Sequence, residues 1–238
     1  MVETSPQRRP RRAPGVGRVL LLEAAREVFS EQGYTRASTR AIAERAGIAE
    51  VLLFRNFGSK AALFSEVALG PFKGFVEQWK SVHPGPDETR TERELAADLI
   101  TRAYALFSEN RGLIVTYIAT SVFEPEVTRL EASPMFLEAI DTLARWAESE
   151  FVEPRGLGPM NVLIANRAVI GMVMSMALFD DWLLQGKGER PSQAEIIDEL
   201  TELILHGAVR SGQRRESRRS SDSLAEGNRA NGRRNLAD

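Results

Sequence analysis

Cysteine is absent from the 238-residue sequence, which excludes disulfide bonds, cysteine-based zinc sites and thiol catalysis. The absence fits a reducing cytoplasm, where we expect the protein to reside. Histidine is scarce too: His83 and His206 are the only two, and they lie too far apart in sequence for metal-ligand spacing. We therefore expect neither a metal site nor a cofactor.

Long apolar runs are also missing. The longest, at 168–179, falls well short of the roughly 20 residues that cross a bilayer. The polar, arginine-rich N-terminus is not followed by the isolated apolar segment of a secretion signal. We expect a soluble protein without a membrane partner.

Charge of one sign is not in excess, because the formal net charge is only −2. Any nucleic-acid contact must therefore come from locally concentrated arginine and lysine. The motifs of common enzymes are missing as well, since there is no glycine-rich phosphate loop, no paired nucleophile and histidine, and no metal-ligand cluster. These absences argue against an enzyme.

The two ends of the chain differ in composition from its middle. Residues 1–17 carry four arginines among prolines, residues 211–238 are rich in Arg, Ser, Gly and Asn, and both are expected to be disordered. The N-terminal arm either contacts DNA phosphates or the minor groove, or is a solvated tail, and its composition fits both. Between the ends, apolar residues recur at helical spacing and no run alternates like a strand. The sequence predicts an all-α protein.

Capping residues and glycine stops divide this middle part into helices. The first is expected over 18–32 and ends at Gly33-Tyr34; Ser38 or Thr39 caps the second, and Gly47 ends it. Further helices are expected at 50–56, 60–82 with a kink at Gly70-Pro71, 91–109, 111–122, 133–152, 160–185 and 192–210. The second and third form a helix-turn-helix, whose second helix is sized for a major groove. Spacing alone also fits an ordinary helical hairpin.

The residues of this region make the interpretation more specific. Apolar, glycine and capping positions together resemble the signature of the tetracycline-repressor (TetR) family, in the stretches Gly33-Tyr34, 38–43, Ala46-Gly47-Ile48, 53–60 and Leu63-Phe64. The resemblance covers about residues 18–66; beyond them only the helical layout and the length agree. It implies a DNA-binding domain at 18–66, a ligand-binding and dimerisation domain at 67–210, and a ligand-responsive transcription regulator.

The resemblance also implies which side chains face DNA. Thr39 and Arg40 would contact phosphate and a guanine edge, and Lys60 would pair with a phosphate at a helix N-terminus. The expected DNA-binding set is Thr39, Arg40, Glu50, Val51, Phe54, Arg55, Asn56 and Lys60.

Several residues depart from the family pattern. Ala49 replaces a Ser or Thr cap and is weaker by about 1 kcal/mol. Phe54 stands where a phosphate-contacting Tyr is frequent, and Asn56 where His is usual. Glu50 is acidic and cannot hold phosphate, but it can accept a hydrogen bond from cytosine N4. These departures affect the operator sequence rather than binding itself.

The C-terminal region carries more aromatic and methionine residues than a minimal bundle needs. Most belong to the core, but methionine clusters often line cavities for flexible apolar ligands, and the family binds its effectors there. We expect a hydrophobic effector, for instance a fatty acyl chain or acyl-CoA. The candidate ligand-binding residues are Leu99, Tyr104, Leu106, Phe107, Tyr117, Phe123, Leu143, Trp146, Met172, Met174 and Met176.

The last two predicted helices are too apolar to leave in water. We expect them to form a four-helix bundle with a second copy through Ile170, Val173, Ala177, Trp182, Ile196, Leu200, Leu203 and Ile204. Such a homodimer would bind a pseudo-palindromic double-stranded operator and change the spacing of its recognition helices through the kinked helix 60–82. The alternative function is a helical scaffold or adaptor without DNA contact.

Overall fold

The computed structural model describes residues 15–85, 87, 89–125, 133–152, 161–186 and 188–207. Regular structure in these ranges is helical, without a strand, and the predicted all-α class is confirmed. No helix in this part of the chain is long and apolar enough to span a membrane. The predictions for the N-terminal arm and the C-terminal tail fall largely on 1–14 and 208–238, which lie outside the described ranges.

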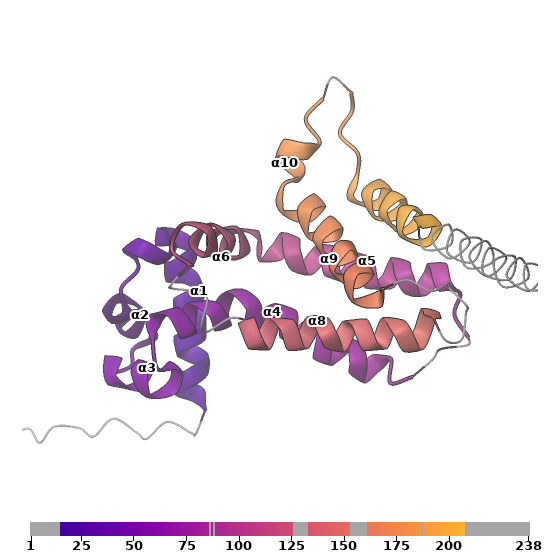
Figure 1. The fold of residues 1–238 in the computed structure, drawn as a ribbon. Coiled ribbons are helices and arrows are strands. Elements are labelled where there is room, and N and C mark those ends of the chain that lie inside the picture. Colours follow the sequence, from indigo (N-terminus) through magenta and orange to yellow (C-terminus); the bar gives the residue numbers. More distant parts are fainter. Residues whose placement is uncertain are drawn as a thin grey trace, which may run out of the picture. The chain divides into compact units, whose positions relative to one another are not determined.

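The described residues belong to two compact units. The first contains α1 (Val16–Arg36), α2 (Thr39–Ala46), α3 (Glu50–Phe57), the part of α4 (Lys60–Val82) that ends at Pro71, and α6 (Arg111–Phe123) from Gly112 onward (Figure 1). The second contains the rest of α4, α5 (Glu92–Glu109), most of α8 (Ser133–Ala147), the π-helix η1 (Glu148–Val152), α9 (Val162–Leu178), α10 (Asp180–Leu183) and a helix over 193–207. Helix α6 thus groups with the N-terminal helices, although the sequence suggested the C-terminal region.

The core of the first unit explains why α6 belongs to it. Phe64 of α4 is fully buried, and its ring centroid lies 4.8 Å from that of Phe29 in α1 and 5.7 Å from that of Tyr117 in α6. Leu113 of α6 is buried in the same cluster as Leu21 and Leu53. Burial of these apolar side chains, at about 25 cal/mol per Å², holds α6 on the three N-terminal helices.

Helix α1 begins at Val16, so its first residues come from the end of the segment predicted to be a disordered arm. Its regular backbone stops at Gly33, whose φ of 72° lies in the left-handed region that favours glycine. The predicted stop at Gly33 is therefore correct, and a short helical continuation reaches Arg36. This bend brings Tyr34 onto Phe64, with ring centroids 4.9 Å apart.

Two long helices predicted for the second unit are interrupted. The segment predicted as one helix at 133–152 changes to a π-helix at Glu148, and the segment predicted at 160–185 ends its first helix at Leu178. Phe179, at φ −121° and ψ 20°, leaves the helical conformation and caps both α9 and α10. Apolar periodicity runs through both interruptions, so it gave no signal of either.

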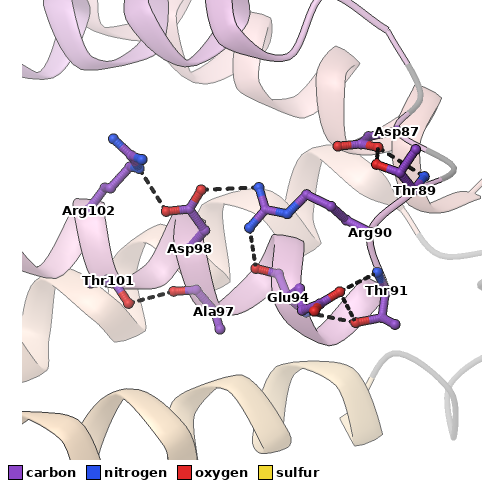
Figure 2. A network of polar contacts seen from close by, with 9 residues as sticks. All are labelled: Asp87, Thr89, Arg90, Thr91, Glu94, Ala97, Asp98, Thr101 and Arg102. Carbon is purple, nitrogen blue, oxygen red and sulfur yellow. Dashed lines mark hydrogen bonds and ion pairs between the residues drawn. The ribbon is translucent and has the colours of Figure 1, made fainter.

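Helix α5 begins at a capping box (Figure 2). The Thr91 hydroxyl accepts from the Glu94 backbone N–H, and the Glu94 carboxylate accepts from the Thr91 backbone N–H at 2.8 Å. Arg90 joins this turn to the next, because its guanidinium donates to the Glu94 carbonyl and to the Asp98 carboxylate, both at 3.2 Å. The start of α5 is thereby fixed.

Ion pairs connect the C-terminal elements of the second unit to α5 and to Arg111, which lies shortly after it. Arg93 of α5 pairs with Asp198 and with Glu202 on the helix over 193–207. Arg111 and Arg190 both pair with Asp180 of α10, at 2.8 and 2.6 Å. These pairs are at least partly exposed, and each contributes at most about 1 kcal/mol.

Candidate DNA interface

Helices α2 and α3 are built by local capping signals. The Ser38 side chain accepts from the Ala41 N–H at 3.1 Å and starts α2, as predicted. Gly47, at φ 62°, ends α2 in the left-handed conformation and donates its N–H to the carbonyls of Ala43 and Glu44. Helix α3 starts after Ala49, which provides no side-chain cap. The turn that separates the two helices is therefore set by residues 47–49.

Helix α3 is anchored by one face and exposes the other. Leu53 is fully buried in the core of the first unit, and Phe57 is 9% exposed. On the opposite face, the side chains of Val51 and Phe54 are 70% and 46% exposed, and Arg55 is exposed beside them. Apolar side chains presented in this way suit contact with thymine methyl groups and sugars in a major groove.

Two of the predicted DNA-binding residues contact each other. The Thr39 hydroxyl donates to the Glu50 carboxylate with an oxygen–oxygen distance of 2.6 Å, across the turn between α2 and α3. Both residues are half-buried. The sequence predicts each of them separately as a DNA contact, and nothing in their spacing of eleven positions signals the bond between them.

Arg40 and Asn56 remain on the surface of the first unit. Arg40 pairs with Glu44 one turn later at 2.9 Å, and this hydrogen bond raises the pKa of its guanidinium. Because the pair is highly exposed, a phosphate can replace Glu44 at little cost. Asn56 donates its amide to the Leu52 carbonyl at 2.6 Å, so its NH₂ group is engaged within α3.

Lys60 opens α4, where the Ser59 side chain accepts from the Ala62 N–H at 2.9 Å. Its ammonium group lies 4.2 Å from the centroid of the Tyr34 ring, within the range of a cation–π interaction. Burial lowers the pKa of Lys60, while the charge of Glu124 acts in the opposite direction. Burial also raises the pKa of Tyr34.

Tyr34 and Glu124 therefore form part of the environment of Lys60. Glu124 follows α6 directly, and it accepts a hydrogen bond from the Thr35 hydroxyl at 3.0 Å. From the sequence, Tyr34 marks only the end of a helix and Glu124 has no predicted role, because the Thr35–Glu124 contact spans 89 positions. An open pocket of about 400 Å³ lies beside them, between residues 32–36 and α6.

The predicted effector residues are not gathered in one place. Tyr117 packs on the core of the first unit, and Phe123, also in that unit, is 82% exposed. The others belong to the second unit, where Tyr104, Phe107, Leu143 and Trp146 are buried, and Leu99, Leu106, Met172, Met174 and Met176 are half-buried. The rings of Phe107 and Trp146 pack on Phe72 and Trp79 of α4, at 6.1 and 5.2 Å between centroids. The effector site stays a prediction.

Comparison with known proteins agrees with the fold and with the family resemblance of the N-terminal region. A family model described as "Bacterial regulatory proteins, tetR family" matches residues 21–67. The HTH-type transcriptional regulator UidR of Escherichia coli K12 is 28% identical over 113 residues, which are 48% of this chain and 56% of UidR. The chain thus matches little more than half the length of this curated relative.

Solved structures extend the likeness over most of the chain. The TetR family transcriptional regulator PfmR of Thermus thermophilus is 26% identical with a TM-score of 0.53, covering 78% of this chain and 97% of PfmR. The regulator FadR of Bacillus subtilis, solved in complex with stearoyl-CoA, is 18% identical with a TM-score of 0.56, covering 79% of this chain and 97% of FadR. At 18% identity, the second likeness concerns the fold alone.

Proposed function

Because the chain belongs to the tetR family of bacterial regulatory proteins, we propose that it is a transcription regulator that binds operator DNA through α2, α3 and the start of α4. The observation that carries this function is the exposed face of α3, where Val51 and Phe54 stand in solvent next to Arg55. Exposed apolar side chains that gather on one face of a short helix are typical of a binding surface.

The cations around this face are suited to phosphate. Arg40 lies in the first turn of α2 and Lys60 in that of α4, where the helix dipole adds partial positive charge. Contacts of this kind position a protein on duplex DNA, while the side chains of α3 select the sequence. A scaffold without DNA contact would need neither feature.

Binding to fragments that flank the gene tests this function, with fluorescence anisotropy over a range of salt concentrations. Arg40→Ala and Lys60→Ala should each weaken binding to all sequences alike and reduce the salt slope by about 1. Lys80→Ala removes an exposed lysine of α4 in the second unit and serves as the matched control. Unchanged binding in both interface variants would contradict the assignment and favour the adaptor alternative.

The regulator acts as a homodimer in this proposal, but only part of the predicted interface is exposed. Ile170, Val173, Ala177, Ile196 and Leu200 are already buried within the chain, at 2–8% exposure, and are not available to a second copy. Of the other predicted residues, Trp182 and Leu203 are exposed and Ile204 is half-buried, and Leu163, Ile164 and Leu183 are further exposed apolar side chains of this region. A second copy related by a two-fold axis would bury exposed apolar side chains of this kind.

Sedimentation equilibrium tests the dimer. Leu203→Glu places a charge on a side chain that is 60% exposed, and it should shift the protein toward monomer. Val82→Glu makes the same kind of change at a 62% exposed position in the last turn of α4 and should leave the mass unchanged. A monomeric parent protein would overturn the proposal.

The effector in this proposal is an elongated apolar molecule such as a fatty acyl chain or acyl-CoA. The support is the half-buried methionines Met172, Met174 and Met176 on α9, together with the likeness in fold to a regulator solved with stearoyl-CoA. Helix α4 contributes to both units and is the element through which binding would shift the population of DNA-binding states. Isothermal titration across acyl chain lengths tests this; saturable binding of polar ligands alone would contradict it.

A further inference from the structure

We propose that Thr39 is a specificity-determining residue that acts by positioning the Glu50 carboxylate for a base edge, rather than by contacting phosphate. The inference rests on the proposed DNA-binding function and adds to it the chemistry of one contact. Its basis is the 2.6 Å hydrogen bond between the Thr39 hydroxyl and Glu50, which joins the first residue of α2 to the first residue of α3.

The numbers of hydrogen-bond donors and acceptors in the pair decide whether Thr39 contacts phosphate or positions Glu50. A hydroxyl has one proton to donate, and a carboxylate can only accept. The Thr39 proton is therefore committed to Glu50, and its remaining lone pairs cannot bind a phosphate oxygen, which is also an acceptor. Donation to phosphate and donation to Glu50 exclude each other. The half-buried position of both side chains favours the internal bond over exchange with solvent.

The same bond leaves Glu50 able to read DNA. A carboxylate has about four acceptor sites on two oxygens, and Thr39 takes one of them through Oε1. Glu50 is the first residue of α3, where the helix dipole favours a negative charge. In the major groove, the donors that fit such an acceptor are the cytosine N4 and adenine N6 amino groups. Guanine O6 and thymine O4 are acceptors and would be rejected.

Positioning matters because glutamate is long and flexible. An unrestrained side chain would lose rotamer freedom on meeting a base and would also reach neighbouring bases. Held by Thr39, the carboxylate has a defined place at the start of the recognition helix before DNA arrives. Discrimination at one base pair therefore depends on both residues, although only Glu50 touches the base.

The test measures binding of the full-length dimer to an operator selected from randomised duplex DNA, and to variants of it changed at each base pair in turn. The proteins are the parent, Thr39→Val, Thr39→Ala, Thr39→Ser, Glu50→Gln and the double variant Thr39→Val/Glu50→Gln. Thr101→Val removes a hydroxyl that donates to the Ala97 carbonyl within α5 and is the matched control. Thermal melting followed by circular dichroism verifies that each protein is folded.

Glu50→Gln and Thr39→Val should lose discrimination at the same base pair, by about tenfold. The double variant should lose no more than either single one, and Thr39→Ser, which keeps the hydroxyl, should retain the parent's preference. Thr39→Ala also removes the hydroxyl and should behave like Thr39→Val, which covers the case of a valine variant that does not fold.

A different pattern for Thr39→Val would overturn the inference. Equal weakening on every operator variant, with a salt slope reduced by about 1, assigns Thr39 to phosphate instead. Loss of discrimination at a base pair that Glu50→Gln does not affect would also overturn it. A parent protein that selects no operator defeats the proposed function itself, and that outcome is recognisable before any variant is compared.

Discussion

Replacing Leu113 with alanine tests whether α6 is part of the DNA-binding unit. Leu113 is 3% exposed and lies in one cluster with Leu21, Phe29 and Leu53 of that unit. Buried Leu→Ala substitutions cost about 2–5 kcal/mol through lost burial and the cavity that remains. The opening equilibrium of the first unit should therefore rise by about 30-fold or more.

Hydrogen exchange followed by mass spectrometry measures this effect segment by segment. Leu113→Ala should accelerate exchange in α1 and α3 as well as in α6, because the three helices share one core. Tryptophan fluorescence adds a second probe, since Trp79, Trp146 and Trp182 all belong to the second unit and should change little. Val122→Ala, at a position of α6 that is 66% exposed, is the control. Acceleration confined to α6, with α1 unaffected, would refute the shared core.

Three further perturbations address single interactions. Thr91→Ala removes the side-chain half of the capping box with Glu94 and should lower the free energy of unfolding by about 1 kcal/mol, as measured by denaturant titration; no loss would mean that the box contributes nothing. Gly47→Ala places a Cβ at a left-handed backbone position, so it should lower the free energy of unfolding by about 1–2 kcal/mol and weaken DNA binding. A neutral result would contradict the requirement for glycine at this turn. Glu124→Gln removes the charge that counteracts burial, so the pKa of Lys60 should fall further below its ordinary value of 10.5, as followed by ¹³C NMR; a rise would contradict the assigned cause.

The sequence predicted well those features that depend on neighbouring residues. The Ser38 cap, the Gly47 stop and the helical class follow from local backbone and side-chain chemistry, and the structure has all three. Features set by distant contacts were not predictable in this way. The packing of Tyr117 on Phe64 joins residues 53 positions apart, and no periodicity in either helix encodes it.

In the candidate interface, too, positions set by local helical spacing were predictable and contacts between distant residues were not. The exposed positions Val51, Phe54 and Arg55 follow from helical spacing around the buried Leu53. The bond between Thr39 and Glu50 depends on how α2 and α3 cross, and the sequence does not specify that angle. The predicted dimer face failed in part for a related reason, because apolar residues such as Val173 can be buried within the chain or by a second copy.

The most direct test of the DNA-binding assignment is selection of duplex DNA from a fully randomised library by the purified protein, followed by sequencing of the bound fraction. The account predicts enrichment of a pseudo-palindromic sequence, which disappears with Arg40→Ala or Lys60→Ala and persists with Lys80→Ala. Recovery of a bound fraction no different from the starting library, with the effector absent and present, would contradict it.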